Sequence, residues 1–247
     1  MDATTIRAVE RAITAMREHL GEQVTIDDMA RAAMFSKFHF SRLFQRVTGV
    51  SPGRFLSALR IEEAKRLLLR TSTTVADIGH TVGYNSIGTF SSRFSSSVGV
   101  SPIAYRHLGG VVATVPVADR PTTGRATTVL GHAHGVPAPT LSPIFIGLFP
   151  GPIPEGPPIR YTVLRGPGSY TLPNVPEGTW FLAARTLCRR LEDCDEFYVG
   201  SSGPVRTESG ITARFTDIRL HPMRVVDPPH LLALPELTSE ELLRVAG

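Results

Sequence analysis

The chain contains one sequence pattern twice: SKFHFSRLFQRVTGVSP at residues 36–52 recurs as SIGTFSSRFSSSVGVSP at residues 86–102. Eight positions are identical when the two stretches are aligned fifty residues apart, including the closing Gly-Val-Ser-Pro. The residues just before each stretch also correspond, at a shift of forty-nine, which implies one additional residue in the second turn. Each copy is therefore predicted to form a short helix, a turn and a longer helix.

Residues that start and end helices stand at matching places in both copies. Ser and Thr are favoured at the start of a helix, an acid three residues later completes a capping box, and glycine ends a helix in the left-handed conformation. Two Phe residues at positions i and i+4 place both rings on one face of a helix. The residues concerned are Thr25, Asp28, Ser36, Phe40, Phe44, Gly49 and Ser51-Pro52 in the first copy, and Thr74, Asp77, Ser86, Phe90, Phe94, Gly99 and Ser101-Pro102 in the second.

A helix from Pro52 to about Arg70 is predicted to join the two copies. Its length would be about 28 Å at ~1.5 Å per residue, close to the ~34 Å of one DNA turn. The two copies can therefore reach successive major grooves on one side of a duplex. A further helix, Thr5 to Leu20, carries apolar residues at helical spacing and is predicted to pack over the first copy.

The composition changes near residue 109. Two prolines precede this point and eighteen follow it. Residues 1–108 carry 14 Lys/Arg and 9 Asp/Glu, a net charge of +5, whereas residues 109–247 carry 12 and 13, a net charge of −1. The positive charge of the first part fits a polyanionic partner. We predict an all-α double helix-turn-helix domain at residues 1–108, a linker at 109–125, and an all-β sandwich-like domain at 126–247.

The second domain is expected to form an antiparallel sandwich of seven short strands, because runs of β-branched and aromatic residues alternate there with turn signals. The expected strands are residues 128–131, 144–149, 159–164, 169–172, 179–185, 197–199 and 211–220.

Several short stretches in and around the second copy carry a resemblance to a known family. They are Ala64-Lys-Arg-Leu-Leu68, Ile78-Gly79, Val82-Gly83-Tyr84, Phe90-Ser91, Phe94 and Gly99 to Arg106. With them, residues 24–108 resemble the DNA-binding domain of the AraC/XylS family of bacterial transcription regulators. The resemblance implies a seven-helix domain in which the second helix of each motif lies in the major groove. This chain departs from the common layout of the family because the domain comes first rather than last. Residues 168–180 also resemble part of a transthyretin-like or carboxypeptidase regulatory-type sandwich.

Candidate DNA contacts lie on the longer helix of each copy, opposite the Phe pair. In the first copy this face offers a guanidinium fork, an amide and apolar groups, which can read base edges. In the second copy small or apolar residues replace every cation and amide, and Arg93, shifted by one position, is interpreted as a phosphate or surface contact. The predicted DNA-binding residues are Lys37, Phe38, Ser41, Arg42, Gln45 and Arg46 in the first copy, and Ser86, Ile87, Gly88, Thr89, Ser91, Ser92 and Arg93 in the second.

The second domain offers little catalytic or metal-binding chemistry. His132 and His134 could share one strand face, but a surface pair is favoured over a metal site because no third ligand is evident. Cys188 and Cys194 are interpreted as ordinary thiols rather than a redox switch or a soft-metal clip. Trp180, Phe181, Tyr170 and Tyr198 are predicted to be core aromatics, with a small-molecule pocket as the alternative. No metal, cofactor or catalytic residue is predicted.

These features favour a transcription regulator that binds double-stranded DNA and is not an enzyme. Its second domain would sense a small-molecule effector or bind a protein partner, including a second copy of the chain. Two alternatives remain: an enzyme with a DNA-targeting module, which would need a recognisable nucleophilic site, and an architectural DNA-binding protein without a sensor. The absence of an apolar signal-peptide region and of a membrane-spanning run predicts a cytoplasmic protein with no membrane partner.

Overall fold

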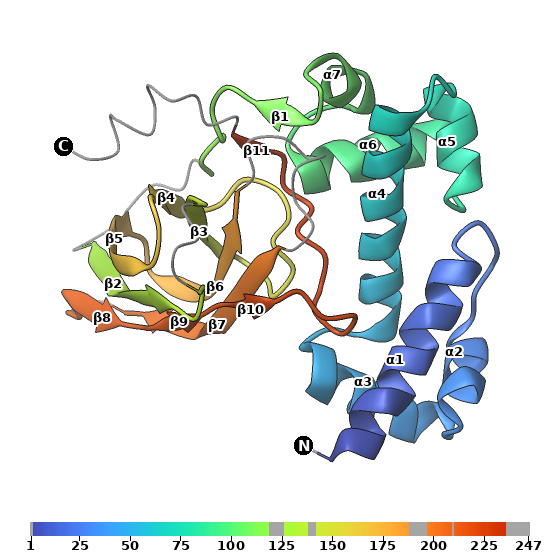
Figure 1. Cartoon of the computed structure of the whole chain (residues 1–247), viewed down its shortest axis with the longest axis horizontal. Helices are drawn as coiled ribbons and strands as arrows, with labels where there is room; N and C mark the ends of the chain where they lie inside the picture. Colours follow the sequence, from blue (N-terminus) through green and yellow to red (C-terminus); the bar gives the residue numbers. More distant parts are fainter. Residues whose placement is uncertain (1, 119–125, 138–141, 188–196, 209, 236–247) are drawn as a thin grey trace. The chain divides into compact units, whose positions relative to one another are not determined.

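The computed structural model describes residues 2–118, 126–137, 142–187, 197–208 and 210–235. Its contacts divide the chain into two compact units (Figure 1). The helical unit comprises the residues up to Val111 together with Arg224–Ala233, and the β unit comprises Val112–Met223 and the residues from Leu234 onward. The predicted fold class, helices followed by a β-rich region with two main sheets, is confirmed.

The helical unit contains the predicted helices in the predicted order. The joining helix spans Pro52–Arg70, as expected. The first helix was expected at residues 5–20 but spans Ala3–Glu18, because the backbone leaves the helical conformation at His19. None of the helices among the described residues is long and apolar enough to cross a membrane. The helices are α1 (Ala3–Glu18), α2 (Ile26–Ala33), α3 (Lys37–Thr48), α4 (Pro52–Arg70), α5 (Val75–Thr81), α6 (Ile87–Val98) and α7 (Pro102–His107). We call α2–α3 the first motif and α5–α6 the second motif.

Most predicted helix ends are confirmed, and two are not. Thr25 forms a full capping box with Asp28, and Thr74 and Ser86 accept hydrogen bonds from backbone N–H groups of their helices. Ser36 occupies the cap position of α3 but forms no capping hydrogen bond through its side chain, and the same is true of Ser51 at α4. Those two predictions of side-chain capping are wrong, although both helices begin where expected. Gly49 and Gly99 end their helices in the left-handed conformation, as predicted.

Met34, which ends α2, also has a left-handed backbone, with a φ of 63°. We expect Met34→Gly to raise the free energy of unfolding by about 0.5 to 1 kcal/mol, since left-handed strain of roughly 1 to 2 kcal/mol is relieved against a smaller entropic cost of glycine. The matched control is Gly49→Ala: its φ is +78° and a Cβ atom there would meet no other atom within 4 Å, so strain alone should destabilise it. Denaturant unfolding measures both, and equal signs for the two variants would contradict the explanation.

Each motif is held to the unit by buried phenylalanine rings. In the first motif Phe40 and Phe44 are fully buried, and Phe44 meets Phe55 of α4 edge-on, with ring centroids 5.4 Å apart. In the second motif Phe90 and Phe94 are buried in the same way. Such aromatic contacts in a close-packed interior fix the rotation of α3 and α6 about their axes.

A segment far along the sequence completes the helical unit. Residues 224–233, which we call the strap, lie against α4 (Figure 1). Lys65 of α4 donates hydrogen bonds to the carbonyls of His230 and Leu231, at 3.2 and 3.0 Å, and Ala233 donates its N–H to the carbonyl of Val98. Leu231 is fully buried. The strap is therefore part of the packed unit, and no sequence prediction assigned it there.

The β unit has two main sheets around a shared apolar core. One has the strand order β10-β7-β6-β3-β4 and the other β5-β2-β8, with β9 also paired to β2. Core side chains come from both sheets, including Val129, Ile146, Leu172 and Trp180. The strands are β1 (Val111–Val112), β2 (Thr127–His134), β3 (Ile144–Phe149), β4 (Arg160–Leu164), β5 (Gly168–Val175), β6 (Gly178–Thr186), β7 (Tyr198–Thr207), β8 (Ala213–Phe215), β9 (Ile218–Arg219), β10 (His221–Pro222) and β11 (Leu234–Pro235).

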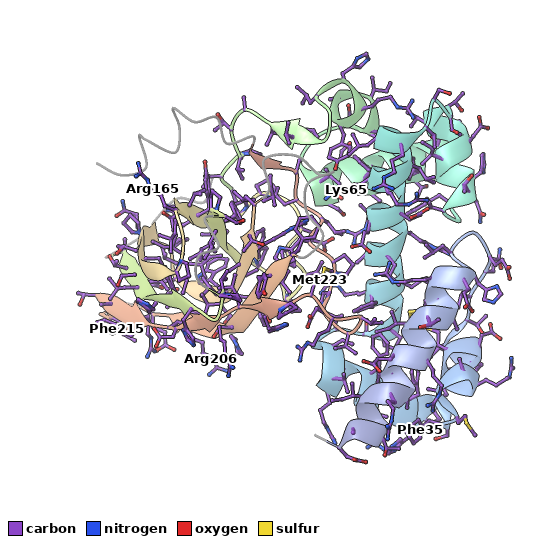
Figure 2. All side chains as sticks on the ribbon, viewed as in Figure 1. Phe35, Lys65, Arg165, Arg206, Phe215 and Met223 are labelled. Atoms are coloured by element: carbon purple, nitrogen blue, oxygen red, sulfur yellow. The ribbon has the colours of Figure 1, made fainter. Side chains whose placement is uncertain are left out.

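The prediction of a purely antiparallel sandwich is wrong in one respect. β8 and β9 run parallel to β2, whereas the other pairs within the two main sheets are antiparallel. In the chain β8 follows β7, a strand of the other main sheet, so no tight hairpin joins β8 to β2. Only strands joined by a tight hairpin must be antiparallel. Phe215 of β8 is 81% exposed (Figure 2).

Candidate DNA-binding surface

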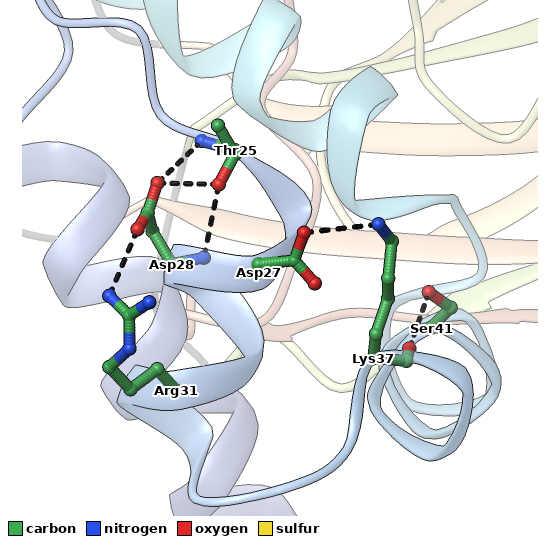
Figure 3. Close-up of polar contacts among 6 residues, drawn as sticks. All are labelled: Thr25, Asp27, Asp28, Arg31, Lys37 and Ser41. Atoms are coloured by element: carbon green, nitrogen blue, oxygen red, sulfur yellow. Dashed lines mark hydrogen bonds and ion pairs between the residues drawn. The ribbon is translucent and has the colours of Figure 1, made fainter.

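The start of the first motif is fixed by a small polar network (Figure 3). The Thr25 N–H donates to the Asp28 carboxylate at 3.0 Å, and the Asp28 N–H donates to the Thr25 hydroxyl at 3.2 Å. The Thr25 hydroxyl also donates to the Asp28 carboxylate at 2.6 Å, and this bond, followed by the one from the Thr25 N–H and by the nearby Arg31, lowers the pKa of the Asp28 carboxyl. The network satisfies backbone donors that a helix start leaves unpaired, and it fixes where α2 begins.

The outward face of α3 carries polar side chains that have no internal partner. Arg42, Gln45 and Arg46 are exposed, and within the described part of the chain their side chains form no hydrogen bond or ion pair. Phe38, near the start of the same helix, is 82% exposed. A guanidinium and an amide can each form two hydrogen bonds with a purine edge, and an aromatic ring can contact a thymine methyl group. The face therefore has the chemistry of a base-reading surface.

Two other predicted contacts on α3 are already engaged (Figure 3). The Lys37 ammonium lies 3.1 Å from the Asp27 carboxylate of α2, in an ion pair that is about half exposed on both sides. The Ser41 hydroxyl donates to the Lys37 carbonyl at 2.9 Å. An exposed pair of this kind contributes little stability, so a DNA phosphate can compete with Asp27 for the ammonium.

The second motif presents a smaller and less charged surface. Ser86 accepts a hydrogen bond from the Thr89 N–H at 3.2 Å and also contacts the Thr89 hydroxyl at 2.9 Å. Ile87 is half exposed, and Gly88 and Ser92 are exposed. Ser91 is only partly exposed. The start of α6 therefore offers backbone N–H groups and short hydroxyls, which suit phosphate oxygens better than base edges.

Arg93 does not lie freely on this surface. It is partly buried, and its Nε donates to the Ser57 hydroxyl of α4 at 3.3 Å. The structure thus places Arg93 between α6 and α4, a location that its position in the repeat did not reveal.

Three other arginines of the helical unit bind backbone carbonyls at the ends of helices. Arg11 donates to Ala32 and Ala33 at the end of α2, Arg60 donates to Leu20 and Glu22 after α1, and Arg106 donates to Leu68 and Thr73 at the end of α4. Burial lowers the pKa of the Arg60 guanidinium, and the nearby Tyr84 acts in the opposite direction. Sequence reasoning counted these cations only as part of a diffuse positive charge, because their partners lie 21 to 40 residues away.

The β unit shows no comparable reactive site in the part that the structure describes. His132 and His134 are exposed on β2, and His132 contacts the Ser169 hydroxyl at 3.4 Å. No group of three or more metal-binding side chains occurs among the described residues. Trp180 and Tyr170 are buried core aromatics, as predicted, whereas Phe181 and Tyr198 are only partly buried. Cys188 and Cys194 lie outside the described residues.

Comparison with known families and proteins agrees with this geometry. A family model described as a helix-turn-helix domain matches residues 29–107. The HTH-type transcriptional regulator YisR of Bacillus subtilis is 36% identical over 102 residues, which cover 41% of this chain and 36% of that protein. The lactose operon transcription activator of Staphylococcus xylosus is 30% identical over 99 residues, covering 40% and 36%. The MmsAB operon regulatory protein of Pseudomonas aeruginosa is 40% identical over 91 residues, covering 37% and 30%.

Two solved structures are also similar. A transcriptional regulator of the AraC-type from Chromobacterium violaceum is 27% identical, with a TM-score of 0.42, and covers 44% of this chain and 96% of that chain. The DNA-binding domain of AdpA, solved with a target DNA, is 30% identical, with a TM-score of 0.39, and covers 40% and 90%.

The chain spans about a third of the length of the three curated relatives, and the names of those relatives are those of transcription regulators, not enzymes. The matched region begins within α2 and contains all of α3, of the joining helix α4 and of the second motif. Residues 29–107 thus match the helix-turn-helix domain family over the region that contains α3 to α6.

Proposed function

We propose that this chain is a transcription regulator that binds duplex DNA through α3 and α6. The observation that carries the proposal is the outward face of α3, where Arg42, Gln45 and Arg46 have no partner among the described residues while Phe40 and Phe44 fix the inner face. Charged side chains held in this way are available for base edges and phosphates without first breaking internal bonds. The names of the curated relatives support the same function.

The two motifs would divide the contact with DNA. The nineteen residues of α4 span about 28 Å, so α3 and α6 can enter successive major grooves. In this arrangement Arg42 and Gln45 read bases. The start of α6, with Ser86 and Thr89, holds phosphates together with Arg93. The first motif therefore supplies most of the sequence discrimination.

The β unit is the proposed sensing or association part of the regulator, which acts in the cytoplasm where its DNA lies. Two measurements separate these roles: sedimentation of the full-length chain reports self-association, and DNA titration with added metabolites reports an effector. A β unit that neither associates nor alters DNA affinity would favour the alternative of an architectural DNA-binding protein.

Binding to DNA is expected to fall steeply as salt is raised. Each phosphate neutralised by Lys or Arg contributes a slope of about −0.9 in a plot of log affinity against log salt, so two such contacts already cost about tenfold between 50 and 200 mM. The test is to capture genomic DNA with the full-length protein and titrate it with a captured duplex at several salt concentrations. Failure to enrich any duplex, or an affinity independent of salt, would refute the proposed function.

A further inference from the structure

The loop that follows α1 is bound to the middle of α4 by one arginine. The Arg60 Nε donates to the Leu20 carbonyl at 3.0 Å, and its Nη2 donates to the Glu22 carbonyl at 2.7 Å. The Arg60 side chain is partly buried, so these bonds are shielded from water to that extent. Hydrogen bonds from a charged donor to carbonyls are stronger than neutral ones. Arg60 therefore links the loop before α2 to the joining helix α4.

The end of α5, in the second motif, also contacts this loop next to Arg60. A Cβ atom added to Gly83, which follows α5, would lie 2.5 Å from the Leu20 carbonyl oxygen and 2.8 Å from the Arg60 guanidinium. A Cβ atom added to Gly21 would lie 2.7 Å from the Thr81 carbonyl oxygen. Real Cβ atoms do not approach other atoms so closely, which means that the two backbones touch only because both positions are glycine. We call this contact, formed by residues 20–22, Arg60 and 81–83, the junction.

We propose that Arg60 is a positioning residue: through the junction it fixes α3 relative to α6 and so sets the spacing of the two DNA half-sites that the protein accepts. This inference rests on the proposed function. α4 alone joins the motifs end to end, but a single helix leaves each motif able to tilt about its own contact with α4. The junction adds a second contact, between the loop that leads into α2 and the end of α5, and two contacts define an orientation that one contact cannot.

A rigid pair of motifs has a definite energetic consequence. When one motif is bound, the other faces its half-site at a high effective concentration only if the spacing matches. One inserted base pair shifts the second half-site by about 3.4 Å and rotates it by roughly 35°, as follows from 10 to 10.5 base pairs per turn. A loosened junction should lower the advantage of the correct spacing and reduce the penalty for the wrong one, while the affinity of each motif for its own half-site stays the same.

The experiment uses the full-length protein and a duplex that the wild-type protein selects from a random library. Affinities are measured for that duplex, for the same duplex with one base pair inserted between the half-sites, and for a duplex with the second half-site scrambled. The variants are Arg60→Ala and Gly21→Ala, and the control is Arg66→Ala, which removes an exposed cation of α4 that pairs with Glu63. Gly21→Ala leaves every residue of α3, α4 and α6 unchanged.

We expect the insertion to weaken wild-type protein and Arg66→Ala by about tenfold or more, and both junction variants by only about threefold, with unchanged affinity for the half-site duplex. Should Arg60→Ala lose its helical circular-dichroism signal, Gly21→Ala alone decides the question. An insertion penalty equal to that of the wild type in the folded variants would overturn the role of the junction. A library selection that yields no duplex would refute the proposed function itself, which separates the two failures.

Discussion

Leu231→Ala in the full-length chain is expected to lower the free energy of unfolding of the helical unit by about 2 to 5 kcal/mol, the usual cost of truncating a fully buried leucine. Leu231 is 0% exposed, and its carbonyl accepts a hydrogen bond from Lys65. The loss combines the transfer of apolar surface to water with the cavity that remains. Denaturant unfolding followed by the helical circular-dichroism signal measures it.

The control for this variant lies in the same segment. Val225 is 45% exposed, so Val225→Ala should change the free energy of unfolding by no more than about 0.5 kcal/mol. If the two variants unfold at the same denaturant concentration, the strap contributes nothing to the stability of the helical unit and its assignment to that unit is wrong.

Arg42→Ala is expected to weaken binding to the selected duplex by about 1 to 3 kcal/mol while leaving binding to scrambled DNA nearly unchanged, because a bidentate contact to a base carries sequence information. Arg42 has no internal partner within the described residues, so its removal should not unfold the protein. Paired titrations with selected and scrambled duplexes give the ratio of affinities for each variant.

Two further variants test the contribution of the second motif to binding. Ser92→Ala should cost much less on the selected duplex, since a short hydroxyl tolerates several bases. Arg93→Ala should weaken both duplexes alike and reduce the salt slope by about one if the guanidinium meets a phosphate. Discrimination that survives the loss of Arg42 but disappears with Ser92 would reverse the proposed division between the motifs.

The helical unit could be predicted closely because its information is local. Caps such as Thr25, left-handed glycines such as Gly49 and the spacing of Phe40 and Phe44 act within one or two turns of helix, and the repeat states them twice. Residue types on the outward face of α3 followed from the same periodicity. Most strand positions in the β unit were likewise approximately correct, but residues 211–220, expected as one strand, form the separate strands β8 and β9, and β7 continues to Thr207 beyond its expected end at residue 199.

The remaining features depend on contacts between residues far apart in the sequence. Arg60 and Arg106 reach carbonyls 33 to 40 residues away, and Lys65 reaches carbonyls 165 and 166 residues away. An arginine with such a partner has the same local sequence pattern as an exposed one. The parallel pairing of β8 with β2 is non-local in the same sense, since it depends on the route of the chain after β7. Pattern and propensity describe neighbours along the chain and leave such pairings open.

The position of the strap in the sequence affects when the helical unit can finish folding during translation. Residues 1–111 leave the ribosome first and can form their seven helices, but the surface that receives residues 224–233 stays uncovered until the β unit has been translated. At about 5 to 20 residues per second, this interval lasts roughly 6 to 23 s. A polypeptide released early, within the β unit, would lack the buried leucine of the strap. The helical unit can therefore pack completely only after the residues up to Ala233 have been translated.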